Sequence, residues 1–230
     1  MAAAGTAFAS SFCMTTAPLT MPADTRPAAR SRNDTVIFGL ACAASVIFLI
    51  ISATARVPTY RINPIFLIPL AWSPYWLRRR LHLHWAHYAL LIVAFLLHDV
   101  GAYGFYQHSP LPFSWDILVH YYFAIPVTLI MHRAIATNYA AVLRPWQAML
   151  VALLFMMGLG AIHEIMEYMT YLLLGEERGM LKPSTSYFFD TQRDLTNNLL
   201  GTLTALMLAA IARSLSGRRT DRAGLPAADE

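Results

Sequence analysis

Apolar residues along the chain form long blocks, which are separated by polar and proline-rich stretches. A membrane-spanning helix needs roughly 20 apolar residues, with about 17 as the lower limit. The blocks lack the short alternating pattern of barrel strands and therefore predict helices. The second block is short and holds three prolines, which predicts a kinked or partly irregular helix. Six spans are expected, at 36–55, 62–77, 81–98, 117–132, 145–174 and 195–212.

The composition agrees with a membrane protein, because 57% of the 230 residues are hydrophobic and only 13% are charged. Soluble domains carry about 25% charged residues. We therefore expect an all-α, polytopic membrane bundle over residues 35–214. Disordered cytoplasmic tails are expected at 1–34 and 215–230. The first tail lacks a basic segment ahead of an apolar core, so it does not resemble a cleaved signal peptide.

The distribution of Lys and Arg predicts the orientation of the bundle. Cytoplasmic loops of membrane proteins carry an excess of these residues. With a cytoplasmic N-terminus, twelve of the 17 cations fall on the cytoplasmic side, so both termini are expected there. The net charge of +4 then requires no nucleic-acid partner; the lipid bilayer is the expected partner, and the oligomeric state stays open. The twelve cations are Arg26, Arg30, Arg32, Arg78, Arg79, Arg80, Arg133, Arg144, Arg213, Arg218, Arg219 and Arg222.

Acidic residues occur where a membrane helix should avoid them. A charged residue inside a span costs at least roughly 2.5–3.5 kcal/mol and marks a candidate site by default. In the predicted topology, four helices bring carboxylates to one depth in the outward half of the membrane. Six of the 13 acidic residues lie in or at the ends of predicted spans, namely Asp99, Asp116, Glu164, Glu167, Asp190 and Asp194.

Spacing within each helix supports convergence of these groups. Residues four apart share a helical face, and three polar pairs have that spacing. Carboxylates gathered in one place repel each other, so a metal ion, shared protons, or Arg and His partners must compensate them. The three pairs are Asp116 and His120, His163 and Glu167, and Asp190 and Asp194.

A mixed set of His and carboxylate ligands suits Zn, Mn or Fe better than a thiolate site would. Glu164 is the candidate general base. The stretch "HEIME" at 163–167 is similar to the zinc-protease pattern H-E-x-x-H but ends in Glu. The candidate metal ligands are Asp116, His120, His163, Glu167, Asp190 and Asp194.

Structural interpretations of the same residues remain open. Asp116 and Asp190 could cap their helices, and His120 alone could be an ordinary core histidine. Asn198, one turn beyond Asp194, could simply form a hydrogen bond across helices. His98 and Asp99, at the outer end of the third predicted span, could also join the site.

Four stretches together resemble the YjdF-like bacterial inner-membrane proteins: "LLHDVGAYGFY", "WDILVHYYFAIPV", "HEIMEY" and "DTQRDLTNNLLGTL". The resemblance covers about residues 60–212 and implies a multi-pass protein of the bacterial inner membrane, but it supplies no reaction. Ile117 stands where the family pattern has Arg, so the chain looks like a divergent member that lacks one counter-charge. The matching positions are His98, Gly101, Asp116, His120, Glu164, Glu167, Asp190, Gln192, Asp194 and Gly201.

The first functional hypothesis is a metal-dependent hydrolase or transferase. The depth of the site in the outer half of the membrane suits a lipid or lipid-linked substrate. The alternative is a proton- or cation-coupled transporter, in which the carboxylates carry the ions. No inverted repeat supports this. A third hypothesis is a non-catalytic protein whose polar cluster only stabilises the bundle.

Overall fold

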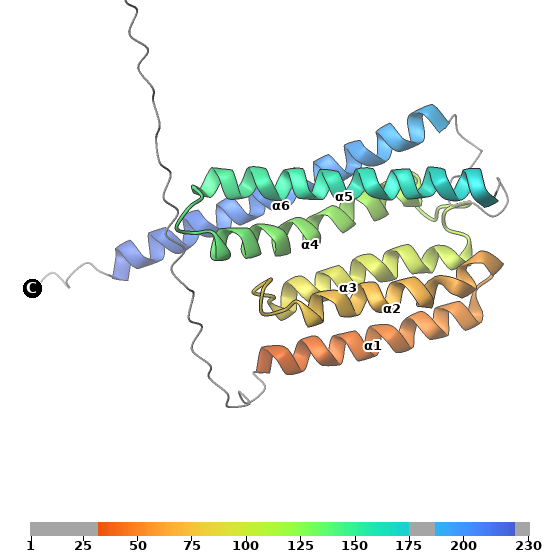
Figure 1. Cartoon of the computed structure of the whole chain (residues 1–230), viewed down its shortest axis with the longest axis horizontal. Coiled ribbons are helices and arrows are strands. Elements are labelled where there is room, and N and C mark those ends of the chain that lie inside the picture. Colours follow the sequence, from red (N-terminus) through yellow and green to blue (C-terminus); the bar gives the residue numbers. More distant parts are fainter. Residues whose placement is uncertain (1–31, 175–186, 224–230) are drawn as a thin grey trace, which may run out of the picture. The chain divides into compact units, whose positions relative to one another are not determined.

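The computed structural model describes residues 32–174 and 187–223, and every regular element in those ranges is helical. The prediction of an all-α fold is therefore confirmed. Figure 1 shows the helices running alongside one another. Their bounds are α1 Arg32–Thr54, η1 Pro58–Ile62, α2 Asn63–Trp76, α3 Trp85–Asp99, η2 Val100–Tyr103, α4 Trp115–Asn138, α5 Pro145–Leu174 and α6 Tyr187–Ala223, where η denotes a 3-10 helix.

Five of the six α-helices are long and apolar enough to cross a membrane: α1, α3 with η2, α4, α5 and α6. The exception is α2, which has 14 residues and contains Pro69 and Pro74. At about 1.5 Å per residue it covers about 21 Å, and η1 directly before it adds about 10 Å. Together they approach the roughly 30 Å of a hydrocarbon core. The block at 62–77 thus forms a helix, but α2 alone is too short to span.

Small residues allow α1, α2 and α3 to pack closely. Helices in lipid gain little from the hydrophobic effect, so small side chains and hydrogen bonds drive their association. Ala41 and Ala71 are fully buried. The Tyr88 hydroxyl on α3 donates to the Ala71 carbonyl on α2 at 2.6 Å. Trp72 Nε1 donates to Ser45 Oγ on α1 at 3.0 Å.

The other three long helices form a second packed group, in which α6 lies mainly against α4. Gly201 permits this, since a Cβ at that position would overlap the backbone oxygen of Tyr121 on α4. On α5, a Cβ at Gly160 would lie 2.6 Å from Asn198 Nδ2 on α6. Two glycines therefore set the separation of α4, α5 and α6 in the turns next to Asp194.

Large apolar side chains cover the outside of the bundle. Leu154, Ile65 and Leu173 are 60%, 70% and 75% exposed. Apolar surface on this scale is typical of a face that contacts lipid or protein. The tails expected at 1–34 and 215–230 lie largely outside the described residues, although α6 continues to Ala223.

Candidate functional site

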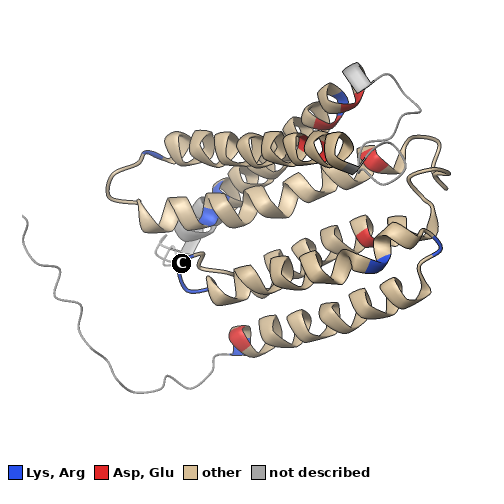
Figure 2. Cartoon of the chain, turned by 45° about the vertical axis from the view of Figure 1, so that its right-hand side comes forward, with Lys and Arg blue, Asp and Glu red and all other residues tan. Residues whose placement is uncertain are grey.

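Three helices bring acidic and histidine side chains to one end of the bundle. Asp116 lies in the first turn of α4, where Ser114 rather than Asp116 is the N-cap residue, and His120 follows one turn later. Asp190 lies in the first turn of α6, and Asp194 lies one turn beyond it. Figure 2 shows Asp and Glu positions gathered on neighbouring helices at this end. We call the set Asp116, His120, His163, Glu164, Glu167, Asp190, Arg193 and Asp194 the charge cluster.

Three side chains of the charge cluster could hold a metal ion, because one ligand atom from each of Asp116, His120 and Asp194 lies within 4.8 Å of the others. His120 Nε2 is 3.5 Å from Asp116 Oδ1 and 3.8 Å from Asp194 Oδ2. Zinc binds such atoms at about 2.0–2.2 Å, so two ligands at a tetrahedral angle stand about 3.4 Å apart. The observed spacing is close to that of a metal site.

Arg193 compensates the carboxylates of the charge cluster. Its guanidinium lies 2.9 Å from Asp116 Oδ2 and 3.2 Å from Asp194 Oδ1, and it also pairs with Asp190. It therefore occupies one oxygen of Asp116 and one of Asp194, and the other oxygen of each faces His120. Asp194 is 1% exposed, and its Oδ2 has no hydrogen-bond partner among the described residues. That buried oxygen faces His120 Nε2 and belongs to the group of ligand atoms that could hold a cation.

The other expected ligands surround these three residues. His163 Nε2 on α5 lies 3.2 Å from Glu167 Oε1, and the His163 ring is centred 5.5 Å from the His120 ring. Asp190 is held by Arg193. The structure thus brings all six expected ligands into one region, with Asp116, His120 and Asp194 closest together.

Glu164 is buried beside this group. It is 4% exposed, and the one polar side chain that approaches its carboxylate from α6 is Thr191, in a loose contact without good hydrogen-bond geometry. His120 and His163 are near enough to interact with it electrostatically. Glu164 follows Gly160 by one helical turn, and Gly160 abuts Asn198, so this carboxylate lies where α5 packs on α6.

An aromatic group flanks the charge cluster on the side of η1 and α3. The Tyr106 hydroxyl is 2.9 Å from His98 Nδ1, and the Tyr106 ring stacks on Tyr60 at a centroid distance of 6.3 Å. Burial raises the pKa of both phenols above their ordinary value, and the negative charges of Asp116 and Glu167 act in the same direction. Tyr106 therefore stays protonated at neutral pH and can donate to His98.

His98 and Asp99 separate in the structure, although they are adjacent in sequence. His98 lies within electrostatic range of His163, His120 and Asp116, which places it beside the charge cluster. Asp99 is fully buried and instead accepts a hydrogen bond from Asn63 on α2, at 3.0 Å.

A family described as "Predicted membrane protein (DUF2238)" matches residues 35–214 of the chain. The chain belongs to this family. No curated protein and no solved structure matches it. Within the DUF2238 match lie all residues of the charge cluster and the aromatic group beside it.

The sequence of this DUF2238 protein suggested no role for Arg193, which looked like an ordinary cation on the outer side. A usable signal was present, since Arg193 follows Asp190 by three residues and directly precedes Asp194. It supplies a counter-charge to Asp116, as the resemblance to YjdF-like proteins led us to expect of an Arg at position 117, where this chain has Ile. Tyr60 and Tyr106 gave no such signal, because they lie in η1 and in the turn after η2, where helical periodicity does not apply.

Proposed function

We propose that this DUF2238 protein is a metal-dependent membrane hydrolase or transferase that acts on a lipid or lipid-linked substrate. The observation that supports this most is the approach of Asp116 Oδ1, His120 Nε2 and Asp194 Oδ2 from two helices. Nitrogen and carboxylate donors in this combination suit Zn, Mn or Fe. Three protein ligands leave a coordination position for water or substrate, as in catalytic zinc sites.

Arg193 is a positioning residue in this proposal. It holds the second oxygen of Asp116 and of Asp194, and so it orients both carboxylates toward His120. When a hydrogen bond that orients a metal ligand is removed, metal affinity or activity commonly falls by about 10–100-fold. His163, Glu167 and Asp190 complete the polar surround and are available as further ligands.

Glu164 is the proposed general base. A bound metal ion supplies polarisation of a phosphoryl or acyl oxygen and lowers the pKa of a coordinated water. Glu164 is within electrostatic range of His120, and only a loose contact with Thr191 engages its carboxylate, so this group can accept a proton.

The surface next to the site supports a lipid substrate. Ile162, Ile165 and Met169 on α5 are 57%, 61% and 45% exposed, at the same depth as Glu164. The side chains of His163 and Glu167, on the same helix, are 38% and 14% exposed. An acyl chain could lie on the apolar face of α5 while its polar head reaches His163 and Glu167.

Metal analysis tests the proposal. The full chain, purified in detergent without chelator, is assayed for Zn, Mn and Fe by elemental mass spectrometry. The matched variants are Asp116→Asn, Asp194→Asn and Asp99→Asn, and the last removes a buried carboxylate outside the charge cluster. We expect about one equivalent of metal in wild type and in Asp99→Asn, and at least tenfold less in the other two. Equal metal content in all four proteins would refute the metal site.

Activity and transport assays then separate the functional classes. With the metal retained, wild type should release phosphate or an acyl group from a lipid mixture, and Glu164→Gln should not. If vesicles instead show a pH-dependent ion flux that Asp194→Asn abolishes, the protein is a transporter. If the Asp variants only lower the melting temperature, with neither metal loss nor flux, the cluster is structural.

We further propose that the protein is a divergent YjdF-like member located in the bacterial inner membrane, with both termini in the cytoplasm. The excess of cations on the predicted cytoplasmic side supports this orientation. Labelling single cysteines placed at Arg144 and Arg61, in intact cells, tests it. An impermeant reagent should reach only the residue at position 61.

A further inference from the structure

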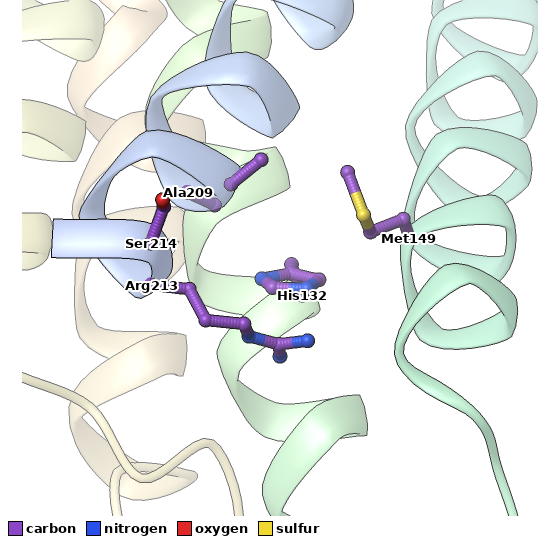
Figure 3. Close-up of a pocket in the computed structure, with 6 residues that line it drawn as sticks. His132, Met149, Ala209, Arg213 and Ser214 are labelled. Atoms are coloured by element: carbon purple, nitrogen blue, oxygen red, sulfur yellow. The ribbon is translucent and has the colours of Figure 1, made fainter. Parts of the chain in front are cut away.

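A second candidate site lies between α4, α5 and α6, near the ends of these helices that are remote from the charge cluster. It is a cavity of about 220 Å³. Figure 3 shows the Arg213 guanidinium beside the His132 ring, with Met149 on α5 across from them. The lining residues are His132, Met149, Ala209, Ala210, Arg213 and Ser214.

The cavity combines a cationic corner with apolar walls. Arg213 carries a permanent charge with five N–H donors in a planar fork that matches phosphate geometry. His132 Nε2 is buried and has no hydrogen-bond partner among the described residues. The side chains of Met149 and the two alanines offer no competing acceptor, and the Ser214 hydroxyl can itself donate to an anion. The chemistry is that of a site for an amphiphile with an anionic head.

The level of the cavity along the helices agrees with this ligand. Arg213 lies two residues before the end of the apolar segment of α6, Phe189–Leu215. Met149 lies in the second turn of α5, which begins at Pro145. Arg213 is therefore near the membrane–water interface, where phospholipid phosphates lie, and Met149 and Ala210 extend toward the apolar region.

We propose that this cavity binds an anionic phospholipid, whose phosphate contacts Arg213 and His132 and whose acyl chain lies along Met149 and Ala210. Basic pockets between membrane helices are known to bind the heads of anionic lipids. This site is independent of the proposed metal chemistry, because it shares no residue with the charge cluster.

Native mass spectrometry of the full chain with added phosphatidylglycerol tests the proposal. Arg213→Gln removes the cation, and Met149→Trp fills the cavity without changing charge. Arg144→Gln is the matched control, since Arg144 is an exposed cation at the α4–α5 connection and does not line the cavity. We expect one retained lipid in wild type and Arg144→Gln, and at least tenfold less in Arg213→Gln and Met149→Trp.

Two results would overturn the proposal. If Arg213→Gln and Arg144→Gln retain the lipid equally, the Arg213 guanidinium makes no specific contact with the lipid phosphate. Displacement of the lipid by an equal concentration of glycerol phosphate would mean that the site binds free anions. Asp194→Asn should retain the lipid, so a failed metal assay and a failed lipid assay are distinguishable.

Discussion

Arg193 Nη2 on α6 donates to Asp116 Oδ2 on α4 at 2.9 Å, across 77 positions of sequence. The same guanidinium pairs with Asp190 and Asp194 on its own helix. One cation therefore offsets three carboxylates and also ties α4 to α6. Because part of this group is buried, removal of the cation leaves three carboxylates whose desolvation is offset only in part, by His120 beside Asp116 and Asp194.

We expect Arg193→Gln to lower the free energy of unfolding by about 1.5–3 kcal/mol, the usual contribution of hydrogen bonds to charged groups. Thermal unfolding in detergent, followed by tryptophan fluorescence, measures the change. Arg193→Lys should restore part of the loss, because it keeps the charge but not the fork that reaches several carboxylates.

Arg61→Gln is the control, since Arg61 is an exposed cation on η1. It should leave the melting temperature unchanged. An Arg193→Gln protein as stable as the Arg61→Gln protein would show that the carboxylates need no counter-charge from this residue.

Gly201→Ala should destabilise the bundle. A Cβ at this position overlaps the Tyr121 backbone oxygen and comes within 2.9 Å of Ala124 Cβ, so α4 and α6 must move apart. Overpacking of this kind costs about 1–3 kcal/mol, and it should weaken metal binding because Asp116 and Asp194 lie on those two helices. Gly158→Ala is the matched control, because a Cβ there meets nothing within 4 Å. If both variants melt at the wild-type temperature, α4 and α6 do not approach each other this closely at Gly201.

Glu164→Gln should raise the melting temperature in metal-free protein. The carboxyl group of Glu164 is buried with only a loose contact to Thr191, which the amide oxygen of Gln can keep, so the substitution removes a desolvation cost at nearly constant shape. The proposed turnover should be lost at the same time, which is the expected exchange of stability for function. Glu167→Gln serves for comparison and should not stabilise, because it removes the pairing with His163. A destabilised Glu164→Gln would indicate that the contact with Thr191 outweighs the desolvation cost.

Tyr106 should make the stability of the folded protein depend on pH in the alkaline range. Burial raises the pKa of its phenol above the ordinary value of 10.0. The unfolded chain then loses this proton near pH 10 while the folded chain keeps it, so this contribution to stability is present below about pH 10 and falls as the pH rises above it. Tyr106→Phe should flatten the decline of the melting temperature at alkaline pH. Tyr139→Phe, at an exposed position, should leave the wild-type slope intact.

The fold was largely predictable, because apolar blocks of the length of a membrane helix leave few alternatives. Five of the six expected spans correspond to helices long enough to cross. The remaining block, at 62–77, was expected to be kinked or partly irregular because of Pro64, Pro69 and Pro74; it forms the 14-residue helix α2, which is too short to span on its own. The preceding 3-10 helix was not predictable, since its five residues carry no periodic pattern.

The location of the charge cluster was also predictable, because carboxylates in membrane helices are costly and must find partners. Pairs spaced four apart correctly placed His120 beside Asp116, and Glu167 beside His163. Sequence reasoning could not rank the six candidate ligands, since that depends on rotamers and on which oxygens Arg193 occupies. The aromatic contact of Tyr106 with His98 depends on Gly101, where a Cβ would overlap the Tyr106 ring.

The shortness of α2 has a consequence for the surrounding lipid. The 3-10 helix η1 that extends α2 carries Arg61, so the uncharged helix that faces lipid here is α2 alone. A hydrophobic stretch shorter than the hydrocarbon core draws the bilayer thinner around it, at a cost of a fraction of a kcal/mol for each Å of mismatch. Acyl-chain length thus becomes an experimental variable: reconstitution into short-chain lipids should stabilise the protein, and long-chain lipids should strain the α2 side of the bundle.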